Sequence, residues 1–337
     1  MKLPMKSLLV ASVIGGLGAC LALSAAANHP APVYAYVTAL GSNTVSMIET
    51  STDTVVATVS VGGGPLGIGV SPDGNRAYVA NAYDNSVSVI DGLSQSVIAT
   101  VPVGLEPLGV AVSPDGTKVY VASTGGGISP GVSVIDAATN VVIAEIPLSD
   151  APASAAVTAN GESLYVGTIG GGVFVIDTAT KQVIRTIPLP LGSGVDSIAL
   201  APNLPFGYVV NAPSGVIAVL NLRANKANRS VATGGGNVQA IALSPDGKRV
   251  YATDSNLAQV VVFDSASERH IQRIALPAGS NPIGISLTPD GRKAYVAGNS
   301  SSSVFVIDTM TTTILTTVSV VGSPYAKGQF IATQWAQ

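Results

Sequence analysis

Cysteine and histidine, on which many metal and nucleophile sites depend, are almost missing from this chain. Its 337 residues include one cysteine, Cys20, and two histidines, His29 and His270. A single cysteine cannot form an intrachain disulfide or a Cys-x-x-Cys-His haem attachment. A Ser-His-Asp hydrolase site and a histidine-based zinc site both need an imidazole beside the reacting group. The sequence therefore predicts no catalytic residue and leaves the metal ligands unknown.

Charge and long apolar runs are also scarce. Charged residues make up 10% of the chain and hydrophobic residues 47%. Beyond the N-terminus, no uninterrupted apolar run reaches the ~20 residues that a membrane-spanning helix needs. The apolar residues come instead in short bursts of Val, Ile, Ala and Tyr, separated by Gly, Pro, Asn and Asp. This pattern is typical of many short strands joined by turns.

The N-terminus reads as a secretory signal peptide over residues 1–27. Lys2 and Lys6 precede an uncharged stretch, and Ala25 to Ala27 offer a small-residue cleavage site before Asn28. The alternative is a lipobox at residues 17–20, in which Cys20 is lipidated and anchors the chain to a membrane. In both cases we expect an exported protein that is periplasmic, extracellular or attached to the cell surface.

An internal repeat dominates the rest of the chain. A tyrosine recurs at intervals of 42 to 45 residues, at Tyr36, Tyr78, Tyr120, Tyr165, Tyr208, Tyr251 and Tyr295. The unit at 77–118 contains four short apolar runs, and its Ser-Pro-Asp-Gly at 113–116 suits a tight turn. Four short strands per repeat form the blade of a propeller. Residues 28–337 are therefore predicted to be one all-β domain, a seven-bladed β-propeller with four-stranded blades.

The two ends of this domain predict how the ring closes. The mature chain starts at the second strand of a blade, near Tyr34, so that blade lacks its innermost strand. Residues 328–333 form a spare strand that matches 67–71 of the first repeat. We expect this C-terminal strand to complete the first blade.

The repeats resemble those of the YVTN family. The resemblance is carried by Tyr36-Val37-Thr38-Ala39, Tyr78-Val79-Ala80-Asn81 and Tyr208-Val209-Val210-Asn211, with Ser-Pro-Asp-Gly at 71–74, 113–116 and 244–247. It covers nearly all of 34–333 and implies an exported or surface β-propeller. The family is also related in fold to propeller lactonases. Residues 158–161 and 201–204 depart from the turn motif.

Propeller sites usually lie at one mouth of the axial channel, and acidic residues map to one such mouth. The loops between second and third strands, and the connections between blades, would carry Asp84, Glu106, Asp150, Asp196 and Asp254. Lys327 is the only basic residue expected there, and a channel mouth of one sign concentrates counter-ions. Oxygen ligands suit Ca²⁺ better than Zn²⁺. These residues are the candidate ligand site, with Ca²⁺ as the one candidate cofactor and none otherwise identified; the alternative is solvated loop charges.

Two further features have structural explanations. Glycine triplets at 62–64, 125–127, 170–172 and 234–236 are expected as tight loops at the same mouth. Arg223, Lys226 and Arg229 on the fifth blade are either a docking patch for an acidic partner or charges that protect an edge strand.

Of three functions, the sequence favours the first, and the other two are alternatives. The first is an exported, non-enzymatic binding module for an unknown protein or a small cationic ligand. The second is a lactonase-like hydrolase, and the third is an accessory subunit of a periplasmic redox system. Without residues 1–27 the chain has 14 basic and 19 acidic residues, so no general nucleic-acid binding is expected.

Overall fold

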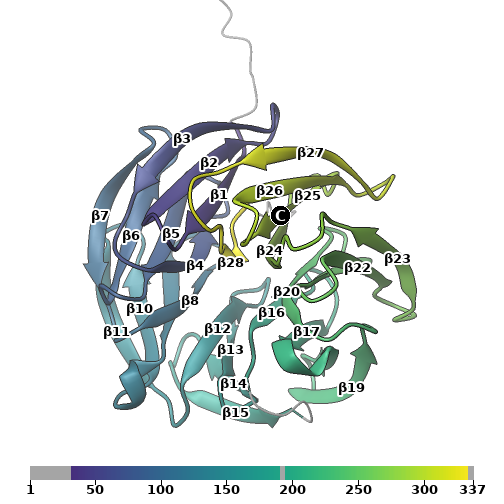
Figure 1. Cartoon of the computed structure of the whole chain (residues 1–337). Coiled ribbons are helices and arrows are strands. Elements are labelled where there is room, and N and C mark those ends of the chain that lie inside the picture. The colour runs from purple at the N-terminus through teal and green to yellow at the C-terminus, as the bar shows by residue number, and fades with distance from the viewer. Residues whose placement is uncertain (1–31, 190–193, 333–337) are drawn as a thin grey trace, which may run out of the picture. The chain divides into compact units, whose positions relative to one another are not determined.

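The computed structural model describes residues 32–189 and 194–332. The expected signal peptide, Cys20 and His29 lie outside the described residues, as does Thr333. Within them, seven small antiparallel sheets stand around a common axis, and their innermost strands surround the centre in Figure 1. The predicted seven-bladed β-propeller is confirmed.

The blades follow one another along the chain. Blade 1 contains β1 (Tyr34–Ala39), β2 (Thr44–Glu49) and β3 (Thr54–Ser60). Blade 2 contains β4 (Pro65–Val70), β5 (Arg76–Asn81), β6 (Ser86–Asp91) and β7 (Ser96–Pro102). Blade 3 contains β8 (Pro107–Val112), β9 (Lys118–Ser123), β10 (Gly131–Asp136) and β11 (Val141–Pro147). Blade 4 contains β12 (Pro152–Val157), β13 (Ser163–Thr168), β14 (Gly172–Asp177) and β15 (Val183–Pro188).

The second half repeats the plan. Blade 5 contains β16 (Ser197–Leu200), β17 (Phe206–Asn211), β18 (Val216–Asn221) and β19 (Lys226–Ala232). Blade 6 contains β20 (Val238–Leu243), β21 (Arg249–Asp254), β22 (Gln259–Asp264) and β23 (His270–Ala275). Blade 7 contains β24 (Pro282–Leu287), β25 (Lys293–Gly298), β26 (Ser303–Asp308) and β27 (Thr313–Ser319), and β28 (Lys327–Gln329) follows it. Two single 3₁₀ turns, η1 (Gly125–Gly127) and η2 (Ala212–Ser214), interrupt loops.

Burial changes from the axis to the rim. The second and third strands of each blade are almost wholly buried because blades pack on both of their faces, whereas the outermost strands are largely exposed. Most of the chain therefore lies between two apolar surfaces, which explains the low content of charged residues.

The Ser-Pro-Asp-Gly segments form the predicted turns between first and second strands. In the turn of blade 3, Ser113 Oγ donates to Asp115 Oδ1 at 2.5 Å, and the Thr117 N–H donates to the same oxygen at 3.0 Å. We call the end of the propeller with these turns the turn face. The opposite end, with the loops between second and third strands and the connections between blades, is the loop face.

The C-terminal segment closes the ring, as predicted, and it does so on two blades at once. Ala39 and Ala35 of β1 form isolated bridges with Pro324 and Ile331. Between these bridges, β28 pairs with β4 of blade 2 rather than with β1. The pairing is parallel, with Gly328 opposite Ile68. Gly328 has φ +104°, and a Cβ there would lie 2.4 Å from the Ile68 carbonyl oxygen. Only glycine permits this approach.

Several of the repeated tyrosines form a hydrogen bond to the next blade. Tyr36 Oη donates to the Gly74 carbonyl at 3.2 Å and Tyr208 Oη to the Ser265 carbonyl at 3.2 Å, in each case in the following blade. Tyr295 of blade 7 reaches across the closure to Asp53 of blade 1. The rings themselves are buried, so the tyrosine combines apolar packing with one hydrogen bond at the blade edge.

This arrangement predicts a loss of stability in alkali. Burial raises the pKa of Tyr165 and of Tyr208 to about 12, from a usual value of about 10. The unfolded chain ionises first, so the stabilisation is complete below about pH 10 and is lost as the pH rises towards 12. We expect a loss of about 2 kcal/mol for each of the two, measured as unfolding free energy against pH. In Tyr208→Phe, the unfolding free energy should fall less steeply as the pH rises. An unfolding free energy that does not change between pH 9 and 12 would contradict the role of these tyrosines.

Candidate functional site

The five carboxylates predicted as a ligand site all lie on the loop face. Asp84 falls between β5 and β6, and Asp254 ends β21. Glu106, Asp150 and Asp196 lie on the connections that enter β8, β12 and β16.

Two of these carboxylates hold the glycine triplets that were noted separately in the sequence. The Gly63 N–H donates to Asp84 Oδ2 at 2.5 Å, and the Gly170 N–H donates to Asp150 Oδ2 at 3.1 Å. In each case the carboxylate joins a blade connection to the loop between second and third strands. A hydrogen bond from a backbone N–H to a carboxylate is charge-assisted and therefore stronger than one between neutral groups. It stabilises the contact between the two loops.

The other two triplets also have an acidic neighbour. Glu106 Oε2 accepts a hydrogen bond of 2.6 Å from Thr124 Oγ1, directly before the triplet at Gly125. Asp254 is fully buried and accepts the Leu257 N–H at 3.1 Å. Its Oδ2 atom lies where a Cβ on Gly235 would stand, only 1.4 Å away.

The fifth carboxylate, Asp196, forms an ion pair across the axis. Asp196 precedes β16 in blade 5, whereas Lys327 belongs to the closing segment of blade 1. Lys327 Nζ lies 3.2 Å from Asp196 Oδ1, and both side chains are mostly buried, with exposed fractions of 19% and 24%. The Ala212 N–H donates to the other Asp196 oxygen at 2.8 Å. Because the two blades lie on opposite sides of the ring, this pair bridges the channel.

The loop-face carboxylates thus have structural partners, and they do not gather. Within residues 32–189 and 194–332, no group of three or more His, Cys, Asp or Glu side chains is arranged to hold a metal ion. Their role in binding a small cationic ligand stays a prediction.

The basic residues of blade 5 are partly neutralised. Arg229 on β19 pairs with Glu268 of blade 6, while Arg223 and Lys226 are exposed. His270 lies on the exposed outer strand β23, where Nε2 is 2.9 Å from the Ala232 carbonyl oxygen. The imidazole is therefore at the rim, as expected, and distant from the axis.

A large cavity lies on the axis and opens at the turn face. Its volume is about 760 Å³, inside the range of about 300–1,000 Å³ for small-molecule sites. We call it the axial cup. It is lined by the ends of the inner strands, namely Gly69–Val70, Val110–Val112, Ala155–Val157, Ser197–Leu200, Ala240–Leu243 and Ile285–Leu287, by Gly328–Gln329, and by the turn prolines Pro72, Pro114, Pro202, Pro245 and Pro289.

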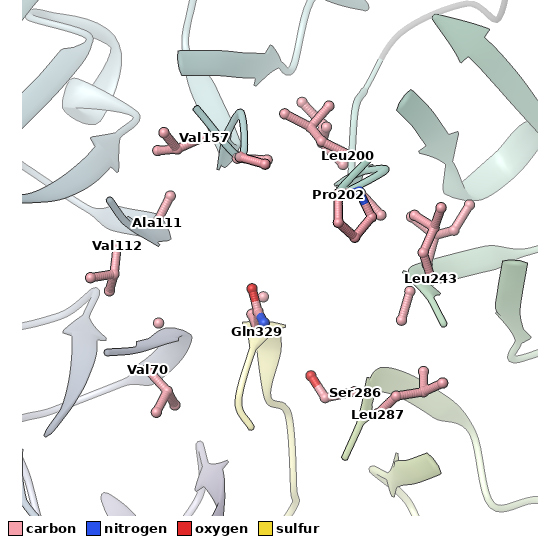
Figure 2. A pocket seen from close by; sticks show the side chains of 18 of the residues that line it. Val70, Ala111, Val112, Val157, Leu200, Pro202, Leu243, Ser286, Leu287 and Gln329 are labelled. Carbon is pink, nitrogen blue, oxygen red and sulfur yellow. The ribbon is translucent and has the colours of Figure 1, made fainter. Parts of the chain in front are cut away.

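The inner end of the axial cup lies against the ion pair across the axis. Asp196 and Lys327 directly precede Ser197 and Gly328, which line the cup. The cup therefore opens away from the predicted acidic mouth. Its lining also includes the polar residues Asn160, Ser197, Asn203, Ser244 and Asp246. The Gln329 amide and the Ser286 hydroxyl face the open space in Figure 2, and Ser286 Oγ already accepts the Phe330 N–H at 3.1 Å.

Asp246 is the one ionisable side chain among the described residues of the lining, and it stands at the exposed rim. Partial burial raises the pKa of Asp246, but hydrogen bonds from Ser244 Oγ and the Lys248 N–H outweigh burial and hold that pKa below its usual value. The rim carboxylate is therefore negatively charged at neutral pH.

Sequence reasoning missed this cup, although a signal was present. A small residue followed by an aliphatic one precedes most of the turns, as in Gly69-Val70, Ala111-Val112, Ala156-Val157, Ala199-Leu200 and Ala242-Leu243. Small side chains at the end of seven converging strands leave space on the axis. No comparable signal marks Gln329, which reaches the cup only because the C-terminal segment leans onto β4.

Comparisons with known proteins give one family match over part of the chain and a similar solved structure. Residues 33–169 match the model of the Cytochrome D1 heme domain family. Among solved structures, the Kuenenia stuttgartiensis hydrazine synthase is similar, with a TM-score of 0.69 and 20% identity over 78% of this chain and 88% of that chain. At this identity the likeness shows the fold alone. A comparison with curated protein sequences gives no match.

The family match corrects one prediction. The sequence identified no cofactor beyond Ca²⁺ as a candidate, whereas a match to a haem domain points to haem. The axial cup does not fit a haem, however. Its described lining contains no His, Cys, Met or Tyr, the usual side-chain ligands of haem iron, and no Lys or Arg to pair with propionates. A haem would have to be held by residues other than those of the cup.

Proposed function

We propose that the chain is an exported accessory propeller of a redox system that uses haem. The observation that carries this proposal is the match of residues 33–169 to the Cytochrome D1 heme domain family. The chain resembles a hydrazine synthase over most of both chains, which supports the same architecture. The third function considered from the sequence, an accessory redox subunit, is therefore preferred.

The accessory role is supported by what the described side chains can do. His270 is at the outer rim, and no described cluster of His, Cys, Asp or Glu is arranged for a metal. A Ser-His-Asp reaction needs its imidazole beside the nucleophile, so the lactonase-like alternative has no such site on the axis. Within the described residues, no helix is long and apolar enough to span a membrane.

The test is capture of the tagged protein from its own host after cross-linking of intact cells. We expect a partner polypeptide to be recovered together with the Soret absorption of haem. Phe330→Ala, which weakens ring closure, is the control for capture that does not depend on the folded propeller. Recovery of the chain alone, with no chromophore and no partner, would overturn the proposal.

A further inference from the structure

Below its rim, the wall of the axial cup is mostly apolar, although Ser197, Ser286 and Gln329 also line it. Val70, Val112, Val157, Leu200 and Leu243, from five different blades, stand around the open space in Figure 2, with their side chains directed outward between the blades. Replacement of water beside the apolar part of this wall by an apolar molecule is favourable.

Three amide side chains line the cup, and two of them, Asn160 and Asn203, are exposed at the rim. The third lies deeper. Gln329 belongs to β28, is half-buried, and directs its amide into the cup. An amide offers both a donor and an acceptor. Its position is fixed by the backbone, because Gln329 pairs with Gly69 of β4. The Ser197 hydroxyl also lines the cup.

The charges around the cup select against ions. Among its described lining residues there is no Lys, Arg or His, and the one carboxylate, Asp246, is at the rim. The Lys327 ammonium below the inner end is already paired with Asp196 at 3.2 Å. An anionic ligand would meet no free cation there, and burying an unpaired charge is costly.

We propose that the axial cup binds a neutral, apolar ring compound that carries one hydrogen-bonding group, a carbonyl or a hydroxyl, and that this group pairs with the Gln329 amide. The ligand enters from the turn face, since the ion pair between Lys327 and Asp196 lies across the inner end. This site is independent of the proposed accessory function and does not use iron coordination.

The first experiment measures binding of N-phenyl-1-naphthylamine, a neutral probe whose fluorescence rises in apolar surroundings. We expect saturable binding of one molecule per chain. Menadione, a neutral naphthoquinone with two carbonyl oxygens, should displace the probe more effectively than 2-methylnaphthalene, which has no hydrogen-bonding group. The anion 2-naphthoate should compete at least about 10-fold less well than menadione because its charge would be buried unpaired.

Substitutions at Gln329 assign the site. Gln329→Ala should lower the affinity for menadione by about 3- to 10-fold and leave the affinity for 2-methylnaphthalene nearly unchanged, as expected for loss of one hydrogen bond. Gln329→Glu should lower the affinity for both compounds by at least about 10-fold. The matched control is Gln272→Glu, the same change on the exposed outer strand β23, which should leave binding of every probe unchanged.

Three results would overturn the site. The first is no saturable fluorescence change with the folded protein, whose melting temperature is checked in parallel. The second is equal displacement by menadione and 2-naphthoate. The third is probe binding that Gln329→Glu and Gln272→Glu affect to the same extent.

Discussion

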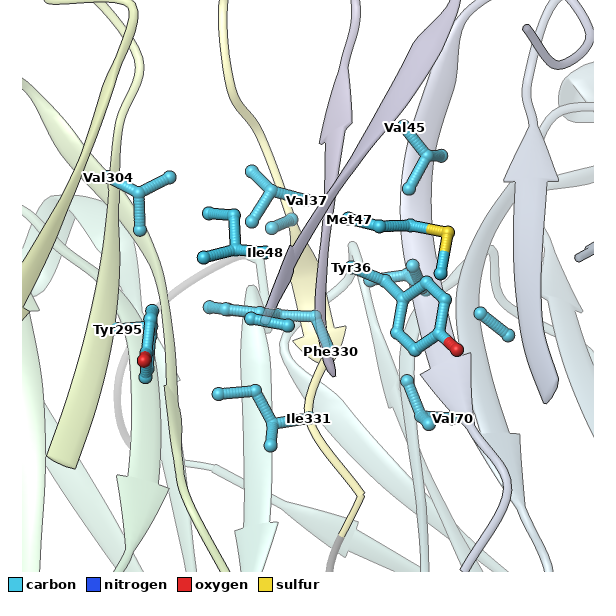
Figure 3. Close-up of a cluster of buried hydrophobic side chains, with 14 of the residues drawn as sticks. Tyr36, Val37, Val45, Met47, Ile48, Val70, Tyr295, Val304, Phe330 and Ile331 are labelled. Atoms are coloured by element: carbon cyan, nitrogen blue, oxygen red, sulfur yellow. The ribbon is translucent and has the colours of Figure 1, made fainter. Parts of the chain in front are cut away.

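Deletion of residues 328–337 is expected to lower the melting temperature by about 10 °C or more, or to yield only aggregated protein. The deletion opens the inner edge of blade 1 and exposes the apolar faces of its neighbours. Phe330 and Ile331 are both completely buried. They pack between Tyr36 of blade 1 and Tyr295 of blade 7 in Figure 3.

Hydrogen bonds add to this loss. The Tyr36 N–H donates to the Phe330 carbonyl at 2.9 Å, and the Phe330 N–H donates to Ser286 Oγ of blade 7 at 3.1 Å. One residue therefore connects two blades through its backbone while its ring fills the space between them. Removal of a buried Phe side chain alone costs about 3–5 kcal/mol.

Single substitutions separate ring closure from general damage to the C-terminus. Phe330→Ala should lose about 3–5 kcal/mol of unfolding free energy, measured by denaturant unfolding. Gln329 precedes Phe330 and lines the cup. Gln329→Ala should lose less than about 1 kcal/mol of unfolding free energy. A deletion mutant that melts like the full chain would contradict closure by this segment.

Gly235→Ala is expected to destabilise the protein by about 3 kcal/mol or more. A Cβ at this position would lie 1.4 Å from Asp254 Oδ2. The carboxylate cannot simply move aside, because Asp254 is fully buried and bound to the Leu257 N–H. The loop between blades 5 and 6 would have to shift as a whole.

The neighbouring glycine is the control. A Cβ on Gly236 would meet only Asn256 Nδ2, at 3.1 Å, at the end of an exposed side chain, so Gly236→Ala should cost less than about 1 kcal/mol. In an Asp254→Ala background the cost of Gly235→Ala should shrink, because the clashing atom is gone. Equal costs in the two backgrounds would show that the carboxylate does not restrict this loop.

The fold could be predicted from the sequence because the strands and turns of each blade are visible within its own repeat. The tyrosine period, the Ser-Pro-Asp-Gly turns and the spare C-terminal strand are local patterns, and each blade can be read without the others. The inner strands pack closely: a Cβ on Gly67 would lie 1.7 Å from the Leu108 carbonyl oxygen.

The candidate site was less predictable because it depends on contacts between blades. The glycine triplets and the loop-face carboxylates were both recognised, yet their pairing, such as Gly170 with Asp150, is set by loop conformation. From the sequence, we expected five carboxylates and one basic residue, Lys327, at the loop face. In the structure, Lys327 forms an ion pair across the axis with one of these carboxylates. The axial cup lies at the other end, where side-chain size rather than charge makes the site.

Hydrogen–deuterium exchange with and without menadione tests most directly which end of the propeller binds. We expect slower exchange in the turn-face segments 69–76 and 241–249 and in β28, which line or adjoin the axial cup, and unchanged exchange in the loop-face segments 82–85 and 233–237. Protection confined to the loop-face segments, with the turn-face segments unchanged, would contradict this expectation.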